Sequence, residues 1–175
     1  MESIEKTKAL EVEVLQTLSD ADWEQIAQLE RQVFDWGLSD EDLEMTHAIA
    51  AKEQSVVVVA RGDEAKIVGY VIGCSNEDAI EDLGEEDEGF EPRKNTLYVF
   101  TTAIDQNHRG GRTFYRMLSD FSQAAKAKGY DRIAAHSPDS HLEGYGRRID
   151  LQPVRTFEDW CDSGEPHTYW EASLE

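Results

Sequence analysis

Two glycines between two arginines form the part of this sequence that most clearly suggests chemistry. Arg109-Gly110-Gly111-Arg112 stands between an apolar run that ends at Ile104 and a stretch with helical spacing. At such a junction of strand, turn and helix, the first helical amides have no intrahelical partners and the helix dipole favours an anion. Glycine lets the backbone approach a bound group, and the arginines add positive charge. The segment predicts a binding site for a phosphorylated cofactor, and the alternative is a tight turn with no ligand.

The elements around this turn are predicted from hydrophobic periodicity. A strand over Asn95–Asp105 leads into the turn, and a helix follows it to about Lys128, where Gly129 ends it. Ser137-Pro138 predicts a break in the chain. The other expected strands are Val12–Leu18, Gln54–Ala60, Lys66–Cys74, Arg132–His136, Pro153–Phe157 and His167–Ala172, and the other expected helices are 20–34, 39–52 and 140–148. The order β-α-α-β-β-β-α-β-α-β-β is typical of a mixed α/β fold, and residues 1–175 are expected to form a single domain.

The formal net charge of −20 narrows the range of partners. A chain this acidic repels nucleic acid and anionic membrane surfaces, because phosphate contacts need Lys and Arg. No stretch approaches a membrane span, and the first residues lack the apolar core of a signal peptide. We therefore expect no nucleic acid, no membrane and a cytoplasmic location. In so acidic a chain, the arginines of the glycine turn form a local positive patch.

The sequence offers little sign of metal or disulfide chemistry. Cys74 and Cys161 are too few for a disulfide framework and too far apart for a zinc site, so no metal is expected. Cys74 lies in an apolar strand and is expected in the core. His136 and His141 have no partner that the sequence reveals.

Two motifs in order resemble those of the GNAT-superfamily N-acetyltransferases. The family signature is Arg or Gln, two residues, Gly, one residue, then Gly or Ala, after a strand that ends in Val or Ile. Here Ile104 and a polar turn lead to Arg109-Gly110-Gly111-Arg112-Thr113-Phe114, with Arg112 and Phe114 at the two signature glycine positions. Downstream, Tyr145-Gly146-Arg147-Arg148 resembles the family's Tyr-x-Lys/Arg segment, without the Gly-Phe that usually follows. The resemblance covers most of the chain.

The resemblance implies a fold and a cofactor. The fold would be a mostly antiparallel mixed sheet flanked by helices, with a splayed central pair of strands. The cofactor would be acetyl-CoA: amides of Arg109, Gly110, Gly111, Arg112, Thr113 and Phe114 would bind the pyrophosphate. The backbone of Ala103 and Ile104 would pair with the pantetheine arm like an added strand.

The resemblance also implies a catalytic acid. Tyr145 would protonate the departing sulfur, since a phenol with a pKa of about 10 keeps its proton at neutral pH. The alternative role for Tyr145 is packing under the cofactor. No general base is assigned, although Asp105 and His108 lie near the turn in sequence. Phe34 and Trp36 are expected either to line the acceptor pocket or to pack in the core.

Residues 76–93 are dense in acid and are expected to form a loop, with at most a weak helical turn at Ala79–Leu83. Beside an acetyl-transfer site, this acidic loop would attract a polyamine, an aminoglycoside or a lysine-bearing peptide. The alternative is a solvated acidic surface.

The expected function is transfer of an acetyl group from acetyl-CoA to a primary amine of a small molecule or peptide, by direct attack in a ternary complex. The alternative is a non-catalytic protein of the same fold whose acidic surface docks a basic or DNA-binding partner. A homodimer is left open by the sequence.

Overall fold

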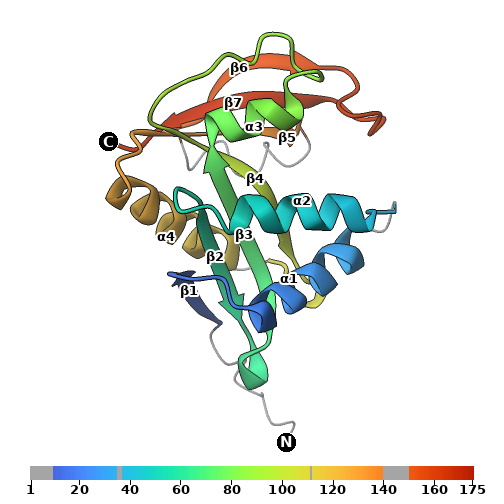
Figure 1. The fold of residues 1–175 in the computed structure, drawn as a ribbon, viewed down its shortest axis with the longest axis vertical. Helices are drawn as coiled ribbons and strands as arrows, with labels where there is room; N and C mark the ends of the chain where they lie inside the picture. The colour runs from blue at the N-terminus through green and yellow to red at the C-terminus, as the bar shows by residue number, and fades with distance from the viewer. Residues whose placement is uncertain (1–9, 35–36, 111, 140–149) are drawn as a thin grey trace, which may run out of the picture.

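Seven strands form one sheet in the order β1-β2-β3-β4-β5-β7-β6 (Figure 1). The computed structural model describes residues 10–34, 37–110, 112–139 and 150–175. Every neighbouring pair is antiparallel except β4 with β5, which is parallel. The strands are β1 (Glu11–Leu15), β2 (Val56–Arg61), β3 (Ile67–Ser75), β4 (Thr96–Ile104), β5 (Arg132–Pro138), β6 (Gln152–Phe157) and β7 (His167–Ser173).

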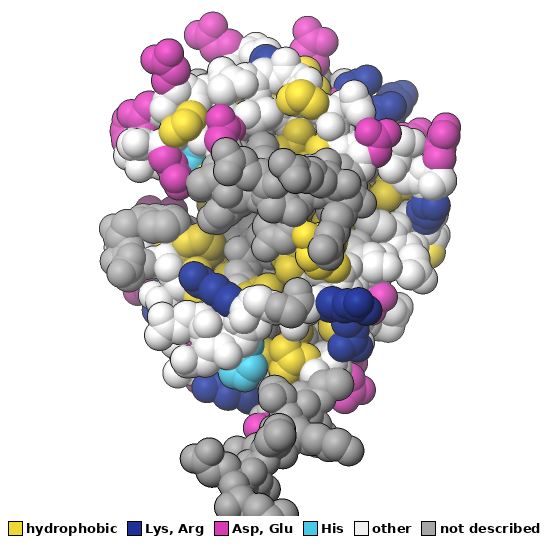
Figure 2. Space-filling view, turned by 180° about the vertical axis from the view of Figure 1, so that it is seen from behind, with side chains coloured by type: hydrophobic (Ala, Val, Ile, Leu, Met, Phe, Trp, Pro, Cys, Tyr) yellow, Lys and Arg dark blue, Asp and Glu magenta, His cyan; other side chains and the backbone are white. Residues whose placement is uncertain are grey.

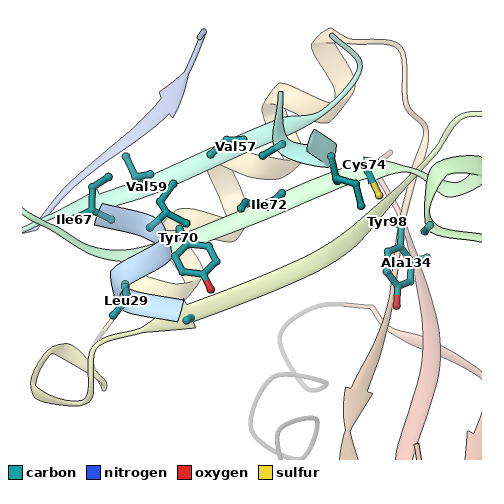
Figure 3. Packing of buried hydrophobic residues seen from close by; sticks show 14 of the residues in the cluster. Leu29, Val57, Val59, Ile67, Tyr70, Ile72, Cys74, Tyr98 and Ala134 are labelled. Carbon is teal, nitrogen blue, oxygen red and sulfur yellow. The ribbon is translucent and has the colours of Figure 1, made fainter. Parts of the chain in front are cut away.

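Four α-helices of the described chain cover the two faces of this sheet. They are α1 (Asp20–Val33), α2 (Asp40–Ala50), α3 (Asn76–Leu83) and α4 (Thr113–Ala127). Buried residues of α1, α2 and α3 share one core cluster, and those of α4 belong to the other. Figure 1 accordingly shows α4 behind the sheet and the other three helices in front of it. The alternation along β2 explains this, since Val57 and Val59 face one cluster while Val56 and Val58 face the other. Figure 3 shows the packing on the front face.

The central strands β4 and β5 separate soon after they begin. Among the described residues they pair only over 96–98 of β4 and 132–134 of β5. β4 then continues to Ile104 along β3 alone. A register shift opposite Ile72 and Gly73 leaves Phe100 as an extra residue, which is a β-bulge in β4. The splayed central pair is thus confirmed, and it leaves the second half of β4 with one edge unpaired by any described strand.

Helix α4 packs directly on the backbone of β3 beside this bulge. A Cβ on Gly73 would lie 2.4 Å from Cζ of Phe121 and 3.1 Å from the carbonyl oxygen of Tyr98. Gly73 therefore permits a contact between the Phe121 ring and the sheet that any other residue would prevent.

The structure corrects two of the predicted elements. The break expected at Ser137-Pro138 is wrong, since β5 runs through Pro138, paired there with His167 of β7. Proline is tolerated because it is the last residue of the strand. The acidic segment is not a plain loop either, because Ser75 caps a full α3 by accepting a hydrogen bond from the Asp78 amide at 3.1 Å.

The expected helix at 140–148, with Tyr145, lies outside the described residues. None of the described helices is both long and apolar enough to cross a membrane.

Candidate active site

The N-terminus of α4 differs from those of the other three helices. Helices α1, α2 and α3 each begin after a serine whose hydroxyl accepts a hydrogen bond from a first-turn amide, and each has acidic residues in its first turn. Helix α4 begins after Arg112, which makes no side-chain cap, and it has no acid in its first turn. Its dipole is therefore not offset by the chain's own carboxylates, which leaves the first turn suited to an external anion.

The turn before α4 is held open by interactions within the chain. Gly110 has φ +86°, and beyond its chain neighbours an added Cβ would meet no atom of the described residues within 4 Å. Nε of Arg109 donates to the carbonyl oxygen of Ile104 at 3.0 Å, which ties the turn to the end of β4. Arg109, Gly110 and Arg112 are all exposed. Several basic side chains lie on the lower half of the rear face, with others at its right and upper right, while acidic ones lie mainly toward its upper rim (Figure 2).

Asp105 and His108 belong to the architecture of this turn. Oδ1 of Asp105 accepts hydrogen bonds from the Asn107 amide at 2.9 Å and from Nδ1 of His108 at 3.0 Å. The hydrogen bond from His108 is the main reason that the pKa of Asp105 lies below its usual value. Oδ2 accepts from the side-chain amide of Gln32 on α1 at 3.3 Å. These contacts fix the turn and engage both groups.

The predicted cofactor residues come together along one continuous path. Ala103 and Ile104 end β4 at its unpaired edge, and the exposed turn leads from them to the first residues of α4. This path consists of Ala103, Ile104, Arg109, Gly110, Arg112, Thr113 and Phe114. Gly111 and Tyr145 lie outside the described residues. An open strand edge next to an uncapped helix N-terminus fits a ligand with an amide-bearing arm and a pyrophosphate.

A buried carboxyl beside β4 was missed by the sequence analysis. Glu30 projects from α1 and is only 4% exposed, and its Oε1 accepts a hydrogen bond from the Thr101 hydroxyl at 2.9 Å. Its Oε2 and the hydroxyl of Tyr70 on β3 are also buried, and neither meets a described atom with good hydrogen-bond geometry. Burial raises the pKa of Glu30 above its ordinary value, although the hydroxyls of Thr101 and Tyr70 oppose this. One signal existed in the sequence, since Glu30 follows Ile26 by four residues on the apolar stripe of its helix.

A second buried carboxyl, Asp87, lies in the acidic segment. Its Oδ2 lies 2.9 Å from Nε2 of His136, whose Nδ1 lies 2.7 Å from the Tyr98 hydroxyl. Arg155 and the Gly89 amide also donate to Asp87. Burial lowers the pKa of His136 to about 4, so the imidazole is neutral, donating to Asp87 and accepting from Tyr98. His136 therefore has two partners, neither of which the sequence reveals.

Other singled-out residues have structural positions. Cys74 is buried in the core as expected, and burial raises the pKa of its thiol to about 12. Cys161 is exposed. Phe34 packs against the front core cluster, while Trp36 lies outside the described residues. Within the described ranges, no three His, Cys, Asp or Glu residues are placed to hold a metal ion.

Comparison with known proteins reveals likeness in structure rather than in sequence. No protein-family model matches the chain, and no curated protein matches it in sequence. Solved structures of GNAT-family N-acetyltransferases share its fold over 94% of its length. The ribosomal-protein-S18-alanine N-acetyltransferase of Escherichia coli is similar with a TM-score of 0.67 and 10% identity, over 95% of its own chain. A GNAT-family acetyltransferase of Staphylococcus aureus gives 0.66 and 12% over its full chain. An aminoglycoside 6'-N-acetyltransferase, solved in complex with coenzyme A, gives 0.67 and 9% over 97% of its chain.

Proposed function

We propose that this protein is an N-acetyltransferase that moves an acetyl group from acetyl-CoA to a primary amine. One observation carries the proposal: the free edge of β4 leads directly into an uncapped, arginine-flanked helix N-terminus in a protein of net charge −20. That arrangement suits an anionic cofactor with an extended arm, and the GNAT fold supports it.

The proposed cofactor contacts follow the path from β4 to α4. The amides of the turn and of the first residues of α4, Thr113 and Phe114, would hold the pyrophosphate together with the side chains of Arg109 and Arg112. Charge-assisted hydrogen bonds of this kind contribute about 1.5–3 kcal/mol each. The pantetheine arm would lie along Ala103 and Ile104 and pair with their backbone.

The proposed reaction is direct attack within a ternary complex. The neutral amine nitrogen attacks the thioester carbonyl carbon, a C–N bond forms, and the C–S bond breaks. The departing sulfur would take a proton from Tyr145, whose phenol is protonated at neutral pH. The nitrogen would release one proton to solvent, and solvent would return one to the Tyr145 phenolate. The products are an amide and free coenzyme A.

Calorimetric titration with acetyl-CoA tests the cofactor site. Replacing both Arg109 and Arg112 by Ala should weaken binding by about 100-fold or more, because two charge-assisted contacts are lost. Arg31→Ala removes an exposed arginine of α1, whose ion pair among the described residues is with Asp40 at 3.2 Å, and should leave binding unchanged.

A second variant separates anion binding from the structure of the turn, since Arg109 also bonds to Ile104. Thr113→Asp copies into α4 the acid that Asp20 and Asp40 provide at the first helical position of α1 and α2. We expect α4 to stay folded and acetyl-CoA to bind about 100-fold more weakly, because the new carboxylate competes with the pyrophosphate.

Turnover is then measured as thiol release with a panel of amines: an aminoglycoside, a polyamine, a peptide with a free N-terminal alanine and a peptide with a free lysine. Acetyl-CoA binding with release of coenzyme A on one of these supports the proposal. Absence of binding to the unmodified protein contradicts it and favours a role in docking a basic partner through the acidic surface.

A further inference from the structure

The carbonyl group of Ile104 points away from β3, toward the free edge of β4. The Asp105 amide donates to the carbonyl oxygen of Val68 at 2.8 Å, and Ile104 stands opposite Gly69 in the register of the two strands. In an antiparallel pair, residues that bond to the partner strand alternate with residues whose N–H and C=O groups point outward. Asp105 bonds to the side of β3, so the backbone groups of Ile104 point to the opposite side. An extended ligand would pair with β4 on that side.

Arg109 bonds to the oxygen on which that pairing depends. Its Nε donates to the carbonyl oxygen of Ile104 at 3.0 Å. An extended ligand would have to bring its own N–H group to about 3 Å from the same oxygen, because that is the range of N–H···O hydrogen bonds. The guanidinium stands beside this oxygen, so Arg109 and the arm of a ligand compete for one acceptor.

Only the side chain of Arg109 would have to move for the arm of a ligand to pair with Ile104. The turn itself is held by Asp105, which accepts hydrogen bonds from Asn107, His108 and Gln32, and none of these bonds uses Arg109. Arg109 is exposed, so its guanidinium can change partners through water without leaving a buried charge behind. The competition therefore needs no change in the backbone of the turn.

A phosphate offers Arg109 a stronger bond than the carbonyl of Ile104 does. Hydrogen bonds from a guanidinium to a charged oxygen are stronger than those to a neutral oxygen, and they are often bidentate. Elsewhere in the chain Arg61 is held by two carboxylates, Glu13 at 2.9 Å and Asp22 at 3.0 Å. Arg109 instead bonds to a neutral oxygen. A pyrophosphate at the N-terminus of α4 would therefore draw the guanidinium away from Ile104 and leave that oxygen to the arm of the ligand.

We propose that Arg109 makes the free edge of β4 selective for thioesters that carry a pyrophosphate. The inference rests on the proposed function and adds a specificity-determining residue to it. A ligand with a pyrophosphate replaces the bond between Arg109 and Ile104 by a stronger one, and its arm pairs with the strand. A thioester without phosphate must displace the arginine and offers it no new bond, so it binds poorly although its arm fits the same edge.

Titration with acetyl-CoA and with S-acetylpantetheine, which has the same arm but no phosphate, tests this role. Arg109→Ala should weaken acetyl-CoA binding and strengthen S-acetylpantetheine binding, each by about tenfold, because a hydrogen bond of a charged group is lost in the first case and need not be broken in the second. Arg112→Ala is the matched control, since it removes the other arginine of the turn and should weaken acetyl-CoA alone. If Arg109 served only to hold the turn, Arg109→Ala would weaken both ligands or leave S-acetylpantetheine unchanged. Either result would overturn the inference and leave the proposed function intact.

Inorganic pyrophosphate gives a second readout on the unmodified protein. At constant ionic strength, pyrophosphate should raise the affinity for S-acetylpantetheine by about tenfold, and S-acetylpantetheine should raise the affinity for pyrophosphate by the same factor, because coupling between two ligands is reciprocal. Arg109→Ala should abolish this coupling, and coupling that persists in the variant would contradict the role of Arg109. An unmodified protein that binds no acetyl-CoA would overturn both the inference and the proposed function.

Discussion

Asp87 and Glu30 are two buried carboxyls on the same face of the sheet, yet their surroundings shift their pKa values in opposite directions. Burial alone would raise the pKa of Asp87, but hydrogen bonds from Arg155 and His136 outweigh it and the pKa lies below the usual value. Glu30 faces only the hydroxyls of Thr101 and Tyr70 among the described donors, and burial keeps its pKa raised. At Asp87 the charged donor Arg155 and the His136 hydrogen bond outweigh burial, whereas at Glu30 neutral hydroxyls do not.

The difference distinguishes a network whose carboxylate is fully engaged from one whose carboxyl is not. Asp87 joins the acidic segment to β5 through His136 and to β6 through Arg155, and no oxygen of its carboxylate is left over. Glu30 and Tyr70 instead each keep a buried polar atom that meets no described atom with good hydrogen-bond geometry. Completed networks hold segments together.

The largest effect is expected when the Asp87 network is broken. Asp87→Ala leaves Arg155 and Nε2 of His136 without their acceptor. It should lower the free energy of unfolding by about 3–5 kcal/mol. Urea denaturation measures this, with Glu88→Ala, an exposed neighbour, as the control expected to change little. A loss for Asp87→Ala no larger than that of the control would show that the network is not structural.

Acid should weaken the same network through His136. The unfolded chain takes up a proton on this residue below about pH 6.5, whereas the folded protein does so only near 4. The free energy of unfolding should therefore fall by on the order of 2–3 kcal/mol as the pH drops from 6.5 to 4. His136→Gln should remove this slope, and an identical slope in the variant would assign the effect to other groups.

Glu30→Gln should have a smaller effect of the opposite sign. The raised pKa of Glu30 means that its charged form opposes folding, and this penalty is absent below its ordinary pKa and present above its folded one. The variant should be more stable than the unmodified protein at pH 7, with the two converging as the pH falls below about 4. Thermal unfolding at both pH values measures this, and lower stability of the variant at pH 7 would contradict it.

The smallest expected difference in stability is between the variants Tyr98→Phe and Tyr70→Phe. Tyr98→Phe removes a hydroxyl that is hydrogen-bonded to His136 and should cost about 1 kcal/mol. Tyr70→Phe removes a buried hydroxyl that meets no described atom with good hydrogen-bond geometry, and should cost less than Tyr98→Phe. If the two variants lost equal stability, the two networks would not differ as stated.

Local patterns predicted most elements of this fold but few of its side-chain partners. The valine run of β2, the serine caps of α1 and α2 and the glycine turn before α4 each depend on neighbours in sequence, and the structure contains all of these elements. Pro138 was mistaken for a break because its effect depends on its place at the end of a paired strand.

The polar clusters could not be predicted because sheet register and helix packing create them. Glu30 meets Thr101 across 71 residues, and His136 meets Asp87 across 49. A glutamate on an apolar stripe marks a candidate, yet nothing nearby in sequence identifies its partner. The role of Tyr145 stays a prediction.

At Gly73, helix α4 packs directly on the sheet through the ring of Phe121. Phe121 lies eight residues after the start of the helix, a little over two turns from the arginine turn. A methyl group at position 73 would push the helix away from the sheet at Phe121 and so shift the first turn of α4, which the arginine turn precedes. The affinity of the turn for a ligand would then depend on how the helix packs at the middle of the sheet. A core substitution that touches no ligand could weaken binding while the protein stays folded.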